Sequence, residues 1–286
     1  MAIVLDNITY TYGMGTPFEK TALRGVLLTI ENGEFLGVIG HTGSGKSTFV
    51  QHLNGLLHPT TGTVTVNGVD ISASTEEAKK MRHKVGMVFQ YPEHQLFEET
   101  IAQDIAFGPK NLGLSADDVD ERVRDAMKFV GLDYDTYAER SPFHLSGGQM
   151  RRVAIAGVVA MDPDFLVLDE PSAGLDPFGR EEIFEEIIRL HKEKGITVIL
   201  VSHNMEDISR MASRLVVLDK GRIVLDGEPM DIFNNHRDEL QAVGVDVPPV
   251  SVTMEYLREQ GLDVSNRVLS VDDAVQAILE GGNHVK

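Results

Sequence analysis

Two stretches of this 286-residue sequence combine residue types whose spacing suits them to chemistry on a phosphorylated ligand. The first, residues 40–47, reads GHTGSGKS and matches the pattern G-x-x-x-x-G-K-[ST]. In such a loop successive backbone N–H groups point at an anion, and the glycines permit its close approach. Lys46 then supplies a positive charge to the β- and γ-phosphates, and the Ser47 hydroxyl ligates magnesium. The loop predicts these nucleotide-binding residues: Gly40, His41, Thr42, Gly43, Ser44, Gly45, Lys46, Ser47 and Thr48.

The second stretch, residues 165–170, is an apolar run that closes on two carboxylates, Asp169 and Glu170. Asp169, at the end of a buried strand, would hold magnesium through water, and Glu170 would orient and deprotonate the attacking water. Adjacent strand residues point to opposite faces, so the two carboxylates need not compete for one role. The alternative is a solvated strand end with two surface acids, and the phosphate loop upstream weighs against it.

Two more polar residues follow apolar runs that are typical of strands. Gln90 comes after residues 85–89, where a neutral amide could touch both metal and water. His203 follows residues 196–201, where a neutral imidazole could hydrogen-bond the γ-phosphate. In open α/β sheets ligands bind at this C-terminal edge. The predicted catalytic residues are therefore Glu170, His203 and Gln90, and the predicted magnesium ligands are Ser47, Gln90 and Asp169.

A third anion-binding element is the pentapeptide LSGGQ, which comprises Leu145, Ser146, Gly147, Gly148 and Gln149. Ser146 would cap a helix that starts at Gly147, which leaves free backbone N–H groups for a phosphate. A single ATP needs only one such cradle from its own chain. The pentapeptide would therefore serve a nucleotide held by another subunit, so that two chains sandwich two ATP molecules.

The elements between these motifs predict an α/β fold. Apolar alternation in residues 2–10 and 26–30 indicates half-buried antiparallel strands. The nearly all-apolar run 35–39 indicates a strand covered on both faces. The remaining predicted elements are strands at 63–66, 85–89, 165–169 and 196–201, and helices at 47–55, at 177–194 and, capped by Ser115 and Asp118, before Gly131.

The C-terminal part follows a break at residues 244–249, which read GVDVPP. Two short helices are predicted there, at 251–260 and 270–280, the second capped by Ser270 and Asp273. Two such helices cannot bury their apolar stripes against each other alone. We therefore expect them to pack on the main domain or on a partner.

Composition narrows the function classes. The chain has no cysteine, which excludes disulfides, thiolate metal sites and cysteine nucleophiles. No secretory signal is expected, and the longest apolar run, at 153–161, is far shorter than the roughly 20 residues of a membrane span. The formal charge of −18 disfavours a direct grip on nucleic acid.

The order of the phosphate loop, LSGGQ and acidic strand end resembles the ATP-binding cassette (ABC) ATPases over about residues 1–240. The resemblance implies an ATPase that uses ATP and Mg²⁺, with a P-loop NTPase nucleotide-binding domain: a RecA-like parallel sheet core, an antiparallel β subdomain and a helical subdomain. The helical insert would span about residues 93–160, and a small C-terminal helical appendage residues 241–286. Asp176 is implied as the D-loop residue. The resemblance favours Tyr12 over Tyr10 as the aromatic ring on which adenine stacks. Position in the sequence alone does not decide between the two tyrosines, and the alternative role is that of a strand aromatic facing the core.

A narrower resemblance is to the energy-coupling factor (ECF) transporter ATPases. It is carried by residues 90–100 (QYPEHQLFEET) and 104–109 (DIAFGP), while residues 15–19 and 141–152 are similar to the A-prime subunit of that family. The resemblance implies a pair of related ATPases that drives a membrane T component and a substrate-capturing S component, usually for vitamins. The run 91–99 would form part of the groove that receives basic coupling helices, and the tail resembles a dimerisation segment.

The expected partners are a sibling ATPase in preference to a second copy, the T component through its coupling helices, and the S component indirectly. No nucleic acid is expected, and the resemblance places the chain at the cytoplasmic face of the cell membrane as a peripheral protein.

Three alternatives remain: a soluble ABC ATPase acting on ribosomes or DNA, an importer ATPase for a metal cation such as cobalt or nickel, and a regulatory subunit that holds ATP without hydrolysing it. The single cassette and the acidity oppose the first, and intact Glu170 and His203 oppose the last.

Overall fold

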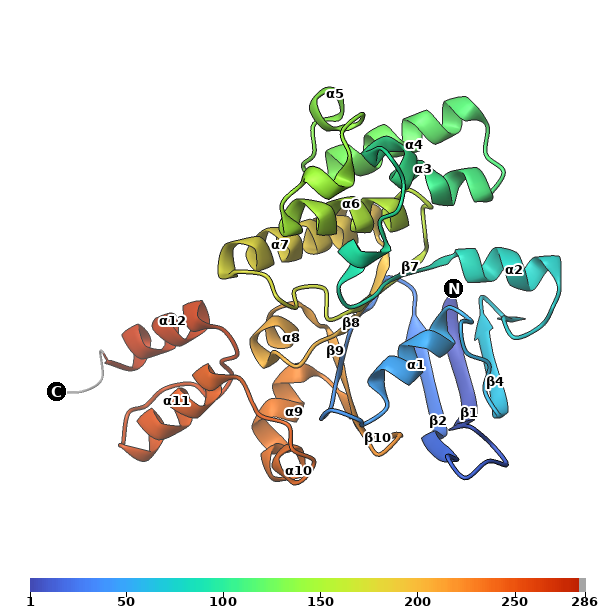
Figure 1. Cartoon of the computed structure of the whole chain (residues 1–286). Helices are drawn as coiled ribbons and strands as arrows, with labels where there is room; N and C mark the ends of the chain where they lie inside the picture. The colour runs from blue at the N-terminus through green and yellow to red at the C-terminus, as the bar shows by residue number, and fades with distance from the viewer. Residues whose placement is uncertain (283–286) are drawn as a thin grey trace.

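The computed structural model describes residues 1–282 and contains two β-sheets with helices around them (Figure 1). The larger sheet has six strands in the order β10-β9-β3-β8-β7-β6. Strands β9, β3, β8, β7 and β6 pair in parallel, and β10 pairs antiparallel with β9. The bounds of these strands are β3 Phe35–Ile39, β6 Val85–Val88, β7 Phe165–Asp169, β8 Thr197–Val201, β9 Arg214–Asp219 and β10 Arg222–Gly227. The predicted parallel core is confirmed.

The smaller sheet is antiparallel and has four strands in the order β2-β1-β4-β5. Its strands are β1 Ala2–Tyr12, β2 Lys20–Glu31, β4 Thr61–Val66 and β5 Val69–Asp70. The pairing of β1 with β2 confirms the predicted antiparallel strands and continues to Tyr12 and Lys20. It therefore carries Tyr12 at the end of the hairpin.

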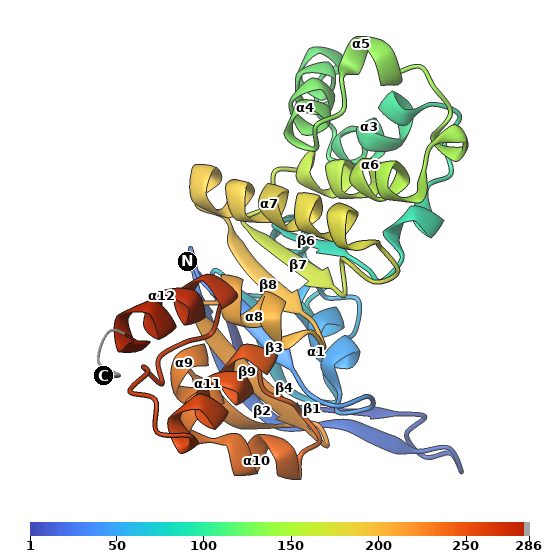
Figure 2. The ribbon, with the colours of Figure 1, turned by 90° about the vertical axis from the view of Figure 1, so that its left-hand side faces the viewer.

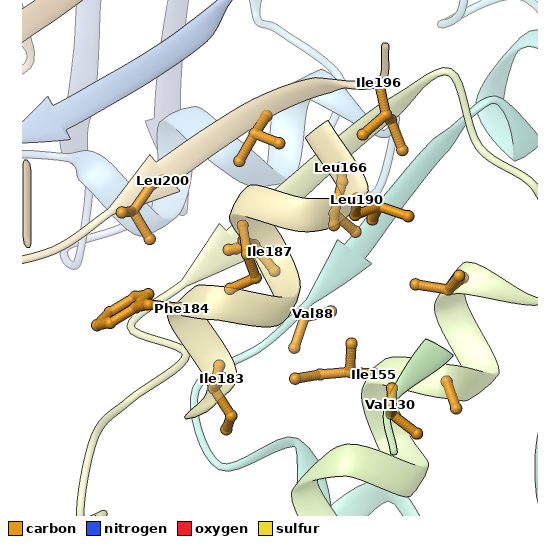
Figure 3. Packing of buried hydrophobic residues seen from close by; sticks show 14 of the residues in the cluster. Val88, Val130, Ile155, Leu166, Ile183, Phe184, Ile187, Leu190, Ile196 and Leu200 are labelled. Carbon is orange, nitrogen blue, oxygen red and sulfur yellow. The ribbon is translucent and has the colours of Figure 1, made fainter. Parts of the chain in front are cut away.

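The parallel strands alternate their side chains between two hydrophobic clusters. Leu166 and Leu168 of β7 belong to the cluster that α7 (Pro177–Lys194) covers, and Figure 3 shows Leu166 near Leu190 of that helix. Phe165 and Val167 point the other way, toward α1 (Lys46–Leu53) and the smaller sheet. Burial on both faces explains why these strands read as continuous apolar runs. On α7, the buried residues are Ile183, Phe184, Ile187 and Leu190, whereas the apolar residue Ile188 is half-buried.

A helical region follows β6 and extends beyond α7 (Figure 2), and its last helix packs against β6 of the larger sheet. Its elements are the 3₁₀ turns η1 Pro92–Gln95 and η2 Pro142–His144 and the helices α3 Ile101–Asn111, α4 Ala116–Phe129, α5 Tyr134–Tyr137 and α6 Gly147–Val159. The Ser115 hydroxyl caps α4 and Ser146 caps α6, as the sequence predicts. The pentapeptide thus starts the last helix of the insert.

Four short helices were not predicted: α2 Glu76–His83, α8 Met205–Met211, α9 Pro229–Asn235 and α10 Arg237–Ala242. Each has at most eight residues. Two turns are too few for a 3.6-residue periodicity to be recognised.

The C-terminal helices are α11 Pro249–Glu259 and α12 Val271–Gly282. The expectation that they cannot bury apolar surface against each other is partly wrong, because Met254 of α11 and Ala274 of α12 share a small cluster with Val264 and Val268. The connecting segment also docks on the main body, where the Ser209 hydroxyl donates to the carbonyl of Leu269 (3.2 Å). The division at residue 240 stays a prediction. Among residues 1–282, no helix combines the length and the apolar character needed to cross a membrane.

Candidate nucleotide-binding and catalytic site

The phosphate loop joins β3 to α1 and depends on glycine at two points. A Cβ on Gly40 would lie 2.3 Å from the Leu218 carbonyl oxygen, and one on Gly45 would lie 2.9 Å from that of Ala22. Both residues also have positive φ, 151° and 112°, a region that side chains disfavour. Gly43 has a φ of 83° with open space beside it, which leaves its backbone accessible to a ligand.

Lys46 folds back over the loop that it follows. Its ammonium donates to the carbonyl oxygens of Gly40 (2.6 Å) and His41 (3.1 Å). Burial lowers the pKa of the Lys46 ammonium, whereas the carboxylates of Glu170 and Asp169 raise it. The positive charge therefore lies between the loop and the acidic end of β7.

Tyr12 lies beside the loop, and Tyr10 does not. The Tyr12 hydroxyl is 3.1 Å from Oγ1 of Thr48, and its side chain is 40% exposed. Tyr12 also lines a cavity of about 680 Å³ together with Gly43, Lys46 and other loop residues. Tyr10 packs against the core and meets the ring of His52 edge-on at 4.8 Å. Of the two tyrosines, Tyr12 is the one that lines the cavity beside the phosphate loop.

The two carboxylates at the end of β7 have different surroundings. Asp169 is 8% exposed; burial and the neighbouring Glu170 charge raise the pKa of its carboxyl, while the Ser47 hydroxyl and Lys46 act in the opposite direction. Glu170 has a φ of 53°, and its backbone N–H donates to the Val201 carbonyl (3.0 Å). A non-glycine residue held in the left-handed region is a feature that clusters at functional sites.

His203 meets Glu170 across the ends of neighbouring strands. Its Nδ1 lies 2.7 Å from Oε1 of Glu170. The parallel register that pairs Asp169 with Val201 brings the residues after β7 and β8 together. Gln90 follows β6, which pairs with β7 so that Val88 lies opposite Leu168. Gln90 is exposed and lies at the same edge of the sheet.

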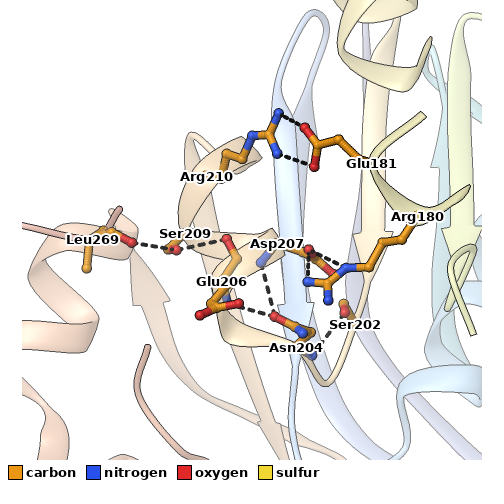
Figure 4. Close-up of polar contacts among 9 residues, drawn as sticks. All are labelled: Arg180, Glu181, Ser202, Asn204, Glu206, Asp207, Ser209, Arg210 and Leu269. Atoms are coloured by element: carbon orange, nitrogen blue, oxygen red, sulfur yellow. Dashed lines mark hydrogen bonds and ion pairs between the residues drawn. The ribbon is translucent and has the colours of Figure 1, made fainter. Parts of the chain in front are cut away.

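Helix α8, which starts at Met205, two residues after His203, is held to α7 by two ion pairs (Figure 4). The Asn204 side chain caps it by accepting from the N–H groups of Glu206 and Asp207. The Arg180 guanidinium donates through Nε to Oδ1 of Asp207 (3.1 Å), and Arg210 pairs with Glu181. These contacts fix the direction in which His203 leaves the sheet.

The pentapeptide forms a second anion-binding feature at another place. Ser146 and Gln149 make a reciprocal capping box, in which Oγ of Ser146 accepts from the N–H of Gln149 (3.3 Å). The predicted members Gly147 and Gly148 sit at the free start of α6, whereas Leu145 packs against the core.

Residues 146–149 line a cavity of about 620 Å³ with Asp176, which caps α7 by accepting from the N–H of Gly179 (2.7 Å). This cavity shares no lining residue with the one beside Tyr12. The structure thus brings the predicted residues together in two groups rather than one. The first is the phosphate loop with Tyr12, Asp169, Glu170, His203 and Gln90; the second is the pentapeptide with Asp176.

One residue that contacts the phosphate loop was missed. Nε2 of His41 lies 2.9 Å from Oδ1 of Asp219, and its Nδ1 lies 2.7 Å from the Thr42 carbonyl oxygen. Asp219 ends the apolar strand β9, so an acid at the end of an apolar run was the available signal.

Comparisons with known proteins agree with this geometry. A family model described as ABC transporter matches residues 23–173. The chain is 53% identical to the energy-coupling factor transporter ATP-binding protein EcfA2 of Clostridium tetani over 98% of this chain and 97% of that protein. Among solved structures, cbiO1 from Clostridium perfringens, part of the ABC transporter complex cbiONQ, has a TM-score of 0.74 and 36% identity and covers 88% of this chain and 98% of its own. A dimeric ATP-binding cassette in a post-hydrolysis state with ADP and Pi has a TM-score of 0.70 and 31% identity, covering 79% of this chain and 98% of its own.

Proposed function

Because the chain belongs to the ABC transporter family, and within it to the energy-coupling factor transporter ATPases, we propose that it powers uptake of a vitamin from an interface with a second ATPase subunit. The chain is an ATP-hydrolysing transporter subunit. The observation that carries the proposal is the separation of its two anion-binding features into cavities with no common lining residue. Each cavity is half of a nucleotide-binding site. A second subunit with the same two cavities completes both sites.

Within one half-site, the residues divide the work. The loop N–H groups and Lys46 bind the phosphates, and the Tyr12 ring stacks on adenine. Glu170 takes the proton from the attacking water, and His203, which contacts it at 2.7 Å, orients its carboxylate. Ser146, Gly147 and Gly148 of the partner subunit's equivalent helix start would stabilise the γ-phosphate charge that develops.

The residues at the sheet edge fit a magnesium ion. A hydroxyl, an amide and a carboxylate are the hard oxygen donors that Mg²⁺ prefers. Asp169 is a buried carboxylate whose raised pKa indicates that its neighbours do not fully offset its burial. We propose Ser47, Gln90 and, through water, Asp169 as its ligands. The ion would neutralise charge on the β- and γ-phosphates.

We propose a sibling ATPase, rather than a second copy, as the natural partner, with the pair bound to the cytoplasmic face of the membrane through a T component and, through it, an S component. The surface offered to the T component is the run 91–99, in which Phe97 is 57% exposed and Glu99 is exposed. Phe97 packs edge-on against Phe107 at 4.9 Å, which forms an aromatic patch beside the acidic side chains.

Affinity purification of the tagged chain from detergent-solubilised membranes, followed by identification of the co-purifying proteins, tests this proposal. We expect a second ABC ATPase, a T component and an S component, whose identity reveals the cargo. Glu99→Lys should lose the membrane components and retain the ATPase partner, while Glu121→Lys, an exposed acid on α4, should retain both. Recovery of no membrane protein with the wild-type chain would refute the transport assignment.

A further inference from the structure

Arg151 is a buried cation that the proposed chemistry does not use. It lies in the second turn of α6, two residues after the pentapeptide, and is 1% exposed. An arginine stays charged in proteins, so burial requires that its donors be satisfied by the protein itself. Four hydrogen bonds satisfy four of its five N–H donors, and they reach two different segments of the chain.

The first segment is η1, which follows Gln90. Nε and Nη2 of Arg151 donate to the two carboxylate oxygens of Glu93, at 3.1 and 3.0 Å. This is the two-pronged geometry in which a guanidinium fixes both the position and the plane of a carboxylate. The Glu93 side chain is itself only 15% exposed. Beside it, Tyr91 has a φ of 56° and stacks on His94, so this short turn is held in one shape.

The second segment is the loop between Glu170 and Asp176. Nη1 of Arg151 donates to the carbonyl oxygens of Pro171 (2.9 Å) and Ala173 (2.8 Å). The N–H of Ala173 in turn donates to the carbonyl of Glu170 (3.1 Å). One guanidinium therefore contacts the loop that begins at the proposed catalytic base.

We infer that Arg151 is a positioning residue that makes the loop after Glu170 and the segment 91–99 move together with α6. Because the guanidinium is planar and rigid, it cannot rotate toward one segment without breaking its hydrogen bonds to the other. Its burial leaves no room for water to replace a lost partner. Since the inference rests on the proposed function, its consequence is specific. Membrane partners that dock on 91–99 would change the placement of the catalytic loop, and ATP at that loop would change the segment 91–99.

ATP hydrolysis by the complete transporter, compared with the ATPase subunits alone, measures this coupling. We expect Arg151→Gln to reduce the stimulation by the membrane partners about fivefold or more, with the KM for ATP changed less than about twofold. Glu93→Gln should act in the same way, and Arg151→Lys, which keeps the charge but not the fork, should restore part of the stimulation. Arg124→Gln is the matched control, because Arg124 makes an exposed pair with Asp120 within α4.

Hydrogen–deuterium exchange on the full chain in a Glu170→Gln background gives an independent readout. In the Glu170→Gln parent, MgATP should change the exchange rates of residues 40–48 and of residues 91–99. When Arg151→Gln is added, MgATP should change the exchange rates of residues 40–48 only. If Arg151→Gln does not fold, Glu93→Gln and Arg151→Lys replace it. An unchanged stimulation, or an ATP response at 91–99 equal to that of the parent, overturns the inference. Absence of stimulation in the wild-type complex would instead count against the transport assignment, and the exchange measurement would still decide the role of Arg151.

Discussion

Nδ1 of His203 lies 2.7 Å from Oε1 of Glu170, and the two side chains differ sharply in exposure. The Glu170 side chain is 13% exposed, whereas that of His203 is 75% exposed. The carboxylate is thus held inside the site, and the imidazole bridges it to the open side where a nucleotide would approach. The backbone of Glu170, with its φ of 53°, is fixed by the bond from its N–H to Val201.

Glu170→Gln should keep ATP binding, trap the ATP-bound dimer and slow hydrolysis by about 10²–10⁴-fold, because the amide cannot accept the proton from water. Steady-state phosphate release and size-exclusion chromatography with ATP measure the two effects. Glu206→Gln, which changes an exposed acid on α8, should retain normal turnover. Normal turnover in Glu170→Gln would remove Glu170 as the base.

The ring of Tyr12, rather than its hydroxyl, should determine ATP affinity. Tyr12→Ala should weaken binding by about 5- to 150-fold, since stacking of a base on an aromatic ring contributes roughly 1–3 kcal/mol. Tyr12→Phe removes only the contact with Thr48 and should stay within about threefold of wild type. Equilibrium titration with a fluorescent ATP analogue compares the two variants. Equal losses in both would show that the ring does not stack on the base.

The two ion pairs between α7 and α8 should respond to pH with opposite signs (Figure 4). Burial raises the pKa of the Asp207 carboxyl above its ordinary value despite Arg180, so the folded state binds this proton more tightly than the unfolded state. Ionised Asp207 therefore costs stability at neutral pH, and its contribution becomes more favourable as the pH falls through the raised pKa. The pKa of Glu181 is lowered by a hydrogen bond from Arg210, so its contribution is present near neutrality and is lost as the pH falls through that lowered pKa.

Urea unfolding between about pH 3 and 7 tests this difference in sign, since the ordinary pKa values of both carboxyls and the lowered pKa of Glu181 lie toward the acid end of that range. Relative to Asp207→Asn, wild type should gain unfolding free energy as the pH is lowered, because protonation removes the cost of the buried charge. Relative to Glu181→Gln, it should lose a few tenths of a kcal/mol (roughly 0.3), as expected of an exposed pair. The same sign for both variants would contradict the assignment of Asp207 as a buried, incompletely satisfied carboxylate.

ATPase activity should depend on subunit association. A monomeric preparation should hydrolyse ATP at least about tenfold more slowly than the associated form, because the γ-phosphate then lacks the donors of the opposite pentapeptide. Activity measured across a dilution series, with light scattering to assign the oligomeric state, gives the comparison. Ser146→Arg, which fills the start of α6, should stay inactive at every concentration. Robust hydrolysis by a demonstrably monomeric sample would contradict the two-subunit site.

Much of the fold could be predicted because its elements are set by local chemistry. Strands β3 and β7 and helix α7 have the bounds that the sequence predicts, since each is a buried apolar run or a capped amphipathic segment. The short helices α8 to α10 could not be predicted, because helices of at most two turns are too short for their periodicity to be recognised.

The sequence by itself determined the chemistry of this protein: the phosphate loop, the pentapeptide and the acidic strand end are contiguous motifs whose backbone and side chains act within a few residues. Only the tertiary structure placed Tyr12 rather than Tyr10 at the loop and brought Arg151 to Glu93 and Ala173. The physical reason is that these relationships join residues far apart in the chain. Strand register and helix packing decide which of them meet, and a linear pattern contains no such information.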